Sequence, residues 1–424
     1  MQDSNIFKLR VQDLMNNVKE LHPEKRGTIV LFAGFEDDRH RFAQESSFYY
    51  FTGIEEPAVV LTIDLDGHKV LYVPNCIEER AKWVVSPLQL TQEYAKQIGV
   101  DEVRLLGSSC SGYQMHPYSS ESEYSNLASD LKKKINSDSV LFALDPYTPY
   151  GYIEQRLLLQ RLRSFGAAPH VVDISSIVAR MRRSKDVKEI ELMYKAVEIT
   201  CIAQEAAARA ISHGANEAEV QASLEYIITG SHAEIAFPSI VASGKNSTVL
   251  HYNQNNAELK KGDLVVVDIG ARYDGYCADI TRTYPVSGTF TKRQKEIYNI
   301  VLDTQSYIAS IAKPGMWLSY KEKPDQSLNH LARAFIKEKG YDQYFPHGIG
   351  HFLGLDVHDV GDYTEPLKAG DVITIEPGIY IADEQIGVRI EDDYWIVKDD
   401  AICLSEGLPK VAEEIEEMVK EKFE

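Results

Sequence analysis

The chain has 424 residues, which is enough for two or three domains of ordinary size. Its 45 basic and 64 acidic residues give a net charge of −19, which argues against nucleic acid and membrane surfaces as partners, because both attract positive charge. The apolar fraction of 44% is typical of a globular protein with sizeable cores.

Five cysteines are widely spaced and form no CxxC pair, which disfavours a disulfide framework or a zinc knuckle. The first residues, MQDSNIFKLR, lack the apolar core of a signal peptide. No apolar run approaches the ~20 residues that cross a membrane. We therefore expect a cytoplasmic protein with reduced thiols and no membrane partner.

Short apolar segments in the first part of the chain are bounded by polar turns, as in the strands of an α/β domain. An Asp66-Gly67 turn joins two of them and predicts a β-hairpin. Residues 108–129 are rich in Ser, Tyr and Glu with little periodicity, and we expect an exposed loop or irregular insert there. The predicted strands are residues 28–33, 58–63, 69–73 and 140–145.

The pattern changes near residues 171–184, where helically spaced apolar residues overlap a cluster of three arginines. We interpret this cluster as a solvated or salt-bridged linker. Asp186 followed by Glu189 is typical of a capping box that begins a long helix. We place the boundary close to residue 180, with domains over residues 1–175 and 176–424. The cluster consists of Arg180, Arg182 and Arg183.

The second part of the chain alternates long helices with hairpins, which indicates an α+β domain with a mainly antiparallel sheet. Its two hairpins both carry carboxylates and look like equivalent parts of a duplicated half. The predicted helices are residues 217–229, 292–311, 326–339 and 413–423, and the predicted hairpins are residues 264–279 and 372–397.

The first hairpin has a strong turn signal at Asp274-Gly275. With that turn, position 268 faces position 281, and Asp268 and Asp279 project to one face as diagonal neighbours. Two acids on the core side of a hydrophobic hairpin are strained without a counter-charge, which suggests a metal. The alternative is that Asp268 caps a turn and Asp279 is exposed.

The second hairpin repeats this arrangement. If its turn lies near residue 383, Glu376 and Glu391 come opposite each other, although Pro377 leaves this register less secure. The alternative is a pair of edge-strand glutamates, and four acids on two hairpins weaken it.

Between the hairpins lies FPHGIGHFLGLDVHD, in which His347 and His351 are four residues apart. On a helix this spacing suggests a zinc pair, but the interleaved glycines predict a loop that approaches a site closely. We take His351 as a candidate ligand, with His347 and His358 nearby. Further upstream, His251 is a candidate for contacting substrate or a transition-state oxygen, and a structural histidine is the alternative.

Oxygen-rich ligation with one imidazole suits Mn(II), Co(II), Fe(II) or Zn(II). Two such ions can share a water, lower its pKa and clamp the attacking and leaving atoms. The chain has no phosphate-cradling glycine loop, so we favour hydrolysis of an amide over that of a phosphate ester. The candidate ligands are Asp268, Asp279, His351, Glu376 and Glu391.

The ordered segments VLHYN, DIGARYDGYCADITRT, HGIGHFLGLDVHD, TIEPGIY and VRIED resemble the pita-bread metallopeptidase family, which includes Xaa-Pro aminopeptidases and Xaa-Pro dipeptidases. The resemblance covers roughly residues 185–410. In addition, SFYYFTGIEEPAVVLTID is similar to the N-terminal domain of aminopeptidase P. The resemblance implies an N-terminal α/β domain followed by a pita-bread catalytic domain.

The family pattern also implies roles for the candidate residues. Asp268 would chelate one metal, Asp279 and Glu391 would bridge both, and His351 and Glu376 would each complete one shell. A bridging hydroxide would attack the carbonyl before proline, and Glu376 would assist proton transfer. His251 and His358 would hold substrate carbonyls and the oxyanion. The residues that would line or buttress the site are His347, Tyr380 and Arg389.

The resemblance leaves the substrate open between peptides and dipeptides. A dipeptidase must bind a free carboxylate, usually with an arginine, and residues 360–375 contain none. We therefore favour an Xaa-Pro aminopeptidase acting on proline-containing peptides, with two divalent ions, manganese foremost, and a homodimer or homotetramer. The alternatives are an Xaa-Pro dipeptidase and a pita-bread protein that binds peptides without cleaving them.

Overall fold

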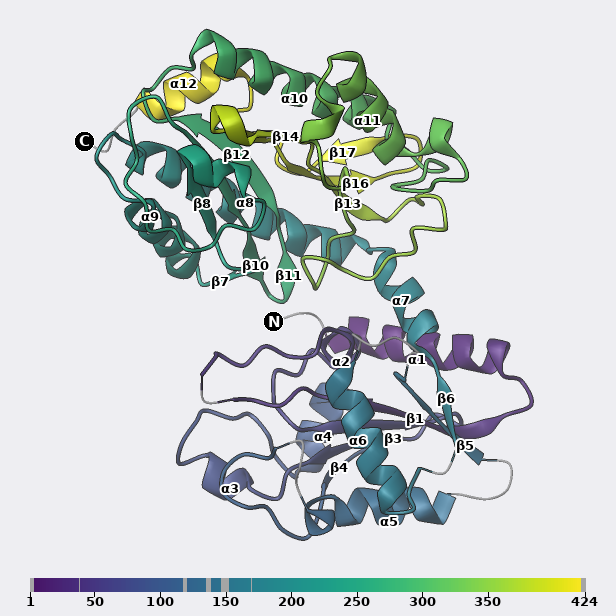
Figure 1. The fold of residues 1–424 in the computed structure, drawn as a ribbon. Helices are drawn as coiled ribbons and strands as arrows, with labels where there is room; N and C mark the ends of the chain where they lie inside the picture. The colour runs from purple at the N-terminus through teal and green to yellow at the C-terminus, as the bar shows by residue number, and fades with distance from the viewer. Residues whose placement is uncertain are drawn as a thin grey trace. The chain divides into compact units, whose positions relative to one another are not determined.

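The computed structural model describes residues 4–37, 39–116, 120–134, 139–145, 152–168 and 170–420. The chain separates into two compact units, Met1–Arg182 and Arg183–Glu424, and each is described by itself (Figure 1). The predicted boundary at residues 175/176 falls at the start of helix α7 (Ser175–Arg183), and the units divide at the end of that helix.

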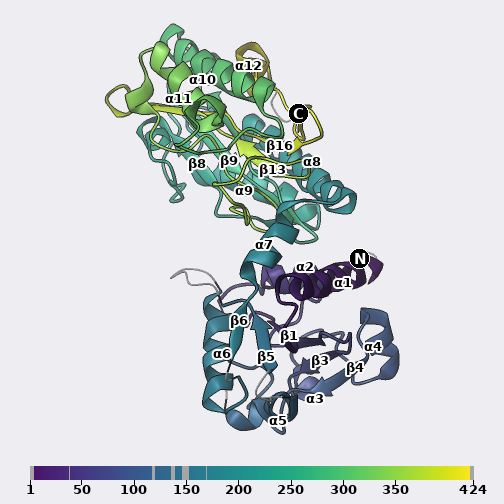
Figure 2. The ribbon, with the colours of Figure 1, turned by 90° about the vertical axis from the view of Figure 1, so that its right-hand side faces the viewer.

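The first unit is built on a six-stranded mixed sheet in the order β4-β3-β2-β1-β5-β6. β1 pairs antiparallel with β2 and parallel with β5. Alternate residues of a strand point to opposite faces, and Val30 and Phe32 pack with Leu127 of α5 and Leu158 of α6. Figure 2 shows α6 running beside β5 and β6. The strands are β1 Arg26–Phe32, β2 Val60–Asp64, β3 Lys69–Val73, β4 Glu102–Leu105, β5 Ser139–Ala143 and β6 Val171–Asp173; the helices are α1 Ser4–Leu21, α2 Ser46–Thr52, α3 Ile77–Arg80, α4 Gln92–Ile98, α5 Ser125–Lys134 and α6 Ile153–Ser164.

The predicted strands of this unit are present, and the predicted hairpin is confirmed as the antiparallel pair β2–β3. The prediction of an exposed loop over residues 108–129 is wrong for its last part. A 3₁₀ helix, η1 (Glu121–Tyr124), leads directly into α5, and Tyr124 and Leu127 are buried. Tyr124, Leu127 and Leu131 recur at helical spacing, which the high polar content obscured. Residues 117–119 lie outside the described residues.

The second unit contains two halves, each with two helices followed by a three-stranded antiparallel sheet. α8 and α9 pack on the strands of the first half, and α10 packs on those of the second (Figure 1). The fold is therefore the predicted α+β arrangement. The first half comprises α8 Val187–Ala210, α9 Glu217–Gly230, β8 Ile240–Ser243, β9 Leu264–Ile269 and β12 Ile280–Pro285; the second comprises α10 Lys292–Ile311, α11 Leu328–Glu338, β13 Val372–Ile375, β16 Asp392–Ile396 and β17 Ala401–Cys403. Shorter elements are β7 Glu234–Ile235, β10 Ala271–Tyr273, β11 Tyr276–Cys277, β14 Gly378–Ile381 and β15 Ile386–Arg389, and the last helix is α12 Ala412–Lys420.

Local signals at the start of the second unit act as predicted. The Asp186 carboxylate accepts from the backbone N–H of Glu189, and the Glu189 side chain accepts from that of Asp186, which completes the capping box of α8. Arg183 is buried and pairs with Asp371 at 2.7 Å. Of the two interpretations of the arginine cluster, the salt-bridged one is correct for this residue.

The registers of both hairpins match the predictions. Asp274 and Gly275 both have positive φ, 45° and 85°, as a type I′ turn requires, and Asp268 pairs with Thr281. In the second hairpin, Gly378 pairs with Arg389. The same register holds between β13 and β16, so the intervening positions 376 and 391 come opposite each other.

Candidate metal centre

The carboxylates of the first hairpin lie where β9 ends and β12 begins. Asp268 and Asp279 are buried, with 8% and 5% of their surfaces exposed. The backbone N–H of Asp279 donates to Oδ2 of Asp393 at 3.1 Å. The alternative in which Asp279 is an exposed residue is therefore wrong.

The glutamates of the second hairpin occupy the interruption between its two ladders. Pro377 has no N–H to donate, and the β13–β16 ladder ends before it. The backbone N–H of Glu376 donates to Ile349, and that of Glu391 donates to Thr281 of β12 at 3.1 Å. The last bond joins the two hairpins and carries Glu391 next to the acids of the first.

His351 reaches the acids from a glycine-rich segment that lies against β13. A Cβ on Gly350 would come within 2.0 Å of the Thr374 carbonyl oxygen, so only glycine fits there. The backbone N–H of Thr374 donates to the His351 carbonyl. The His351 Nδ1 lies 3.1 Å from the Phe352 carbonyl, which assigns the proton to Nδ1 and leaves the Nε2 lone pair free.

Nε2 of His351 faces three of the carboxylates. It lies 3.4 Å from Asp279 Oδ2, 3.9 Å from Glu376 Oε1 and 4.0 Å from Glu391 Oε1. Asp279, His351 and Glu391 each offer a ligand atom, and these atoms all lie within 4.8 Å of one another. The structure thus brings together candidate ligands from both hairpins and the histidine segment.

Asp268 stands at the edge of this group and is held by Arg389, whose Nη2 donates to Asp268 Oδ2 at 2.7 Å. The negative charge of Asp268 also contributes to the raised pKa values of Asp279, Glu376 and Glu391, so Asp268 belongs to the same group of acids. The five predicted ligands therefore converge.

The protein alone compensates the charge of this cluster poorly. Burial, and then repulsion by neighbouring acids, raise the pKa values of Asp279 and Glu391 well above their ordinary range. Burial raises the pKa of Glu376 to about 8. Burial, and then the nearby His358, lower the pKa of His351 to about 4, so its imidazole is neutral and can act as a ligand.

The predicted lining residues form a hydrogen-bonded chain beside the acids. His347 Nε2 lies 2.9 Å from the Tyr380 hydroxyl. The same hydroxyl accepts a hydrogen bond from Arg389 Nη1 at 3.0 Å. Burial, and then the positive Arg389, lower the pKa of His347 to about 4. His347 is thus a neutral acceptor of the tyrosine proton.

The two remaining predicted histidines are exposed and lie near the cluster. The ring centroids of His358 and His351 are 4.2 Å apart. The pKa of His358 is lowered, first by its partial removal from water and then by His251. His251 also contributes to the lowered pKa of His347, so these two histidines lie near each other.

Sequence reasoning missed Thr281 as part of this site. Its hydroxyl donates to Glu391 Oε2 at 2.7 Å and accepts from Arg389 Nε at 3.2 Å. The predicted register places Thr281 opposite Asp268, so its position was a usable signal.

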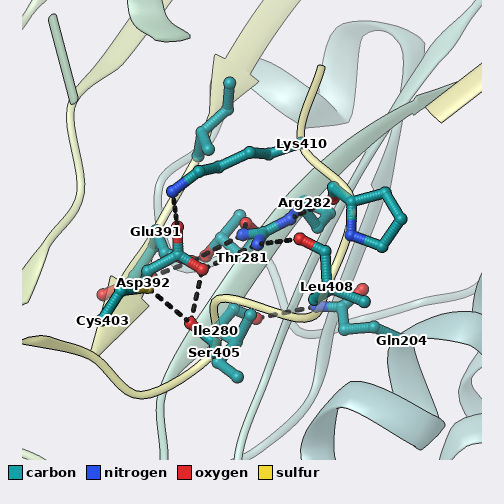
Figure 3. A network of polar contacts seen from close by, with 12 residues as sticks. Gln204, Ile280, Thr281, Arg282, Glu391, Asp392, Cys403, Ser405, Leu408 and Lys410 are labelled. Atoms are coloured by element: carbon teal, nitrogen blue, oxygen red, sulfur yellow. Dashed lines mark hydrogen bonds and ion pairs between the residues drawn. The ribbon is translucent and has the colours of Figure 1, made fainter. Parts of the chain in front are cut away.

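A second missed feature is the buried ion pair of Arg282 and Asp392, which lies next to Thr281 and Glu391 in sequence (Figure 3). Both side chains are fully buried, and Arg282 Nη1 donates to the Thr281 and Glu391 carbonyls at 2.9 and 2.8 Å. The guanidinium therefore joins β12 to the start of β16, next to the candidate ligand Glu391.

Residues 191–398 match metallopeptidase family M24, and residues 7–110 match the N-terminal domain of aminopeptidase P. The Xaa-Pro aminopeptidase of Escherichia coli K12 is 31% identical over 419 residues, covering 90% of each chain. The chain belongs to metallopeptidase family M24. It is an aminopeptidase P-like member, because it also carries the N-terminal domain.

The chain is also similar to an Xaa-Pro dipeptidase and to a solved structure of aminopeptidase P. The Xaa-Pro dipeptidase of Pyrococcus horikoshii is 42% identical over 256 residues, covering 59% of this chain and 69% of the relative. The structure of Escherichia coli aminopeptidase P with the inhibitor Pro-Leu aligns with a TM-score of 0.81 at 28% identity, covering 99% of this chain and 98% of that one. The predicted pita-bread fold with an aminopeptidase P-type N-terminal domain is confirmed. In the described part of the chain, none of the helices combines the length and the apolar composition of a membrane span.

Members of family M24 are metal-dependent, and the donor set of this chain fits divalent cations. Asp268 Oδ1 and Asp279 Oδ1 are buried and have no hydrogen-bond partner within the described ranges. Buried carboxylate oxygens without partners are costly, and oxygen ligands with one imidazole suit hard-to-borderline divalent ions. Cations at this position would offset both the unpartnered oxygens and the mutual repulsion of the acids.

Proposed function

We propose that this chain is a two-metal Xaa-Pro aminopeptidase that removes the first residue of peptides whose second residue is proline. The observation that carries the proposal is the convergence of three buried carboxylates, the partly buried Glu376 and one neutral imidazole in a chain that is similar to Xaa-Pro aminopeptidases over nearly its whole length. The predicted cytoplasmic location and homodimer or homotetramer stay predictions.

We assign Asp268, Asp279, His351, Glu376 and Glu391 as the residues that hold two divalent ions, with manganese favoured. When bound, such ions polarise a substrate carbonyl and activate water for attack. The ligand set is supported by the two unpartnered carboxylate oxygens and by the lone pair on His351 Nε2.

The chain's own groups supply the proton transfers and the oxyanion contacts. Glu376 is partly buried and has a raised pKa, so it is suited to take a proton from the attacking water and deliver it to the proline nitrogen. His251 and His358 are exposed beside the cluster and are suited to donate hydrogen bonds to the substrate carbonyl and developing oxyanion.

His347, Tyr380 and Arg389 complete the proposed site as residues that line it. Because Tyr380 is fixed between the other two, its hydroxyl has one defined orientation. Arg389 orients Asp268 through a charge-assisted bond and holds Thr281 against Glu391.

The second candidate is an Xaa-Pro dipeptidase, favoured by the 42% identity to such an enzyme over 256 residues. Against it, residues 360–375 contain no arginine for a free carboxylate. The dipeptidase similarity also covers only 59% of the chain, whereas the aminopeptidase similarity covers 90%.

The deciding experiment incubates manganese-loaded protein with Xaa-Pro-Xaa tripeptides and with Xaa-Pro dipeptides, with Xaa-Ala-Xaa tripeptides as the control. Release of the first residue from the proline tripeptides alone supports the proposal. Cleavage of dipeptides only supports the dipeptidase. Binding of proline peptides without cleavage would leave a non-catalytic peptide-binding protein.

A further inference from the structure

Glu217 is a fully buried carboxylate at the first residue of α9, outside the candidate metal centre. Five hydrogen bonds end on its two oxygens. Oε1 accepts from the backbone N–H and the hydroxyl of Ser243 at 2.7 and 2.6 Å, and from the Asn246 amide at 3.1 Å. Oε2 accepts from the Tyr252 hydroxyl at 2.7 Å and from the backbone N–H of Ala257 at 2.9 Å.

These donors flank His251 on both sides along the chain. Ser243 and Asn246 precede it, and Tyr252 and Ala257 follow it, so one carboxylate closes the whole loop that presents this histidine. The five donors are neutral groups, and a carboxylate side chain has two oxygens that can accept from all of them at once.

The loop held in this way also packs against the second hairpin. Its 3₁₀ helix η2 (Gly244–Thr248) lies on β15, and the Ser247 hydroxyl accepts from the backbone N–H of Gly387 at 2.9 Å. A Cβ on Gly387 would come within 1.9 Å of the Ser247 carbonyl oxygen. β15 ends at Arg389, so the Glu217 loop has a defined position relative to the candidate site.

We propose that Glu217 is a positioning residue that fixes the loop of residues 243–257 and thereby orients His251 toward the substrate. This inference rests on the proposed function for the role of His251, whereas the anchoring of the loop does not. Glu217 itself does not touch the candidate ligands; its contacts lie on the loop.

Glu217→Gln tests the proposal with almost no change in volume. The amide nitrogen cannot accept, so at least one backbone N–H, that of Ser243 or Ala257, loses its acceptor. We expect faster amide hydrogen exchange over residues 243–257, unchanged exchange in β9 and β12, and unchanged manganese affinity by calorimetry. Unchanged loop exchange would overturn the proposed anchoring, whether or not the protein is a peptidase.

The matched control is Glu219→Gln, which lies in the same helical turn. Glu219 is exposed, and its carboxylate accepts from the backbone N–H of Asn216 within the cap of the same helix. This variant also changes a carboxylate at the start of α9, but the glutamine oxygen can still accept from Asn216, and the loop of residues 243–257 should keep its exchange rates. Tyr252→Phe is the milder second variant should Glu217→Gln fold poorly, because it removes a single donor.

Kinetics then separate positioning from a general structural effect. With Xaa-Pro-Xaa peptides we expect Glu217→Gln to lower kcat/KM by on the order of 10²-fold, the loss that a displacement of about 1 Å can cause. In a His251→Ala background the same change should have less than about a twofold effect, because the residue it orients is gone. Equal losses in both backgrounds would overturn the positioning role, while absence of any wild-type peptidase activity would instead refute the proposed function.

Discussion

Arg389 donates from Nη2 to Oδ2 of Asp268 at 2.7 Å, although the two residues stand on different hairpins. The same guanidinium donates to Tyr380 and Thr281. One planar group with a fork of donors therefore connects an acid of the first hairpin with a lining residue of the second. A lysine ammonium is a compact point charge on a flexible stem and does not reproduce this geometry.

We expect Arg389→Lys to lower kcat/KM for Xaa-Pro-Xaa peptides by about 10- to 100-fold, the range found when groups that orient metal ligands are changed. Manganese affinity, measured by calorimetry, should fall as well, because Asp268 loses its fixed partner. Tyr380→Phe is the comparison variant and should leave metal affinity unchanged, since Tyr380 does not contact the acids. Wild-type affinity and turnover in Arg389→Lys would contradict this account.

Asp279→Asn and Glu391→Gln should each reduce turnover by more than about 100-fold. Changing a residue that only supports a metal ligand typically costs up to about 100-fold, and loss of a ligand itself should cost more. Both variants remove a charge from a cluster that repels itself, so the folded structure should persist. Circular dichroism checks the fold and a peptide assay checks turnover. Near-normal turnover in either variant would exclude the proposed ligand role.

The registers of both hairpins could be predicted because they follow from local rules. A two-residue turn at Asp274-Gly275 and the alternation of side chains place Asp268 opposite Thr281 without any knowledge of the rest of the fold. The capping box of Asp186 and Glu189 is equally local.

Contacts between separate elements could not be predicted in this way. The bond from Thr281 to Glu391 joins residues 110 apart in sequence, and those from Glu217 reach 26 to 40 residues along the chain. Nothing in the periodicity of either segment encodes such a pairing. The helix that begins at Ser125 was missed for another reason, because its polar residues hide a narrow apolar stripe.

The Arg282–Asp392 pair should stabilise the junction of β12 and β16. Arg282→Met leaves the buried Asp392 without its main partner and should lower the free energy of unfolding by about 3–5 kcal/mol. Arg293→Met is the control, because its pair with Glu384 is exposed and such pairs contribute about 1 kcal/mol or less. Urea unfolding of the metal-loaded protein measures the free energy of unfolding of both variants. Equal decreases in the two variants would show that the buried Arg282–Asp392 pair contributes no more to stability than the exposed pair.

The pH dependence of stability tests the electrostatics of the acid cluster through Glu376. In protein stripped of metal, the folded-state pKa of Glu376 is raised from 4.5 to about 8 by burial. Below pH 4.5 the carboxyl is protonated in both the folded and unfolded states and has no effect on stability. Between pH 4.5 and about 8 only the unfolded state releases its proton, so the wild type loses stability as pH rises.

Glu376→Gln cannot titrate, so we expect its melting temperature relative to the stripped wild type to rise progressively from pH 4.5 to about 8 and then to level off. Differential scanning fluorimetry across this range measures the difference, and added manganese should reduce it because bound cations stabilise the ionised carboxylate. Glu384→Gln is the control: Arg293 lowers the pKa of that exposed glutamate, so its effect should not grow in this window. A Glu376→Gln difference that is independent of pH would mean that Glu376 is already ionised in the metal-free fold, and the cluster would then not need cations to balance it.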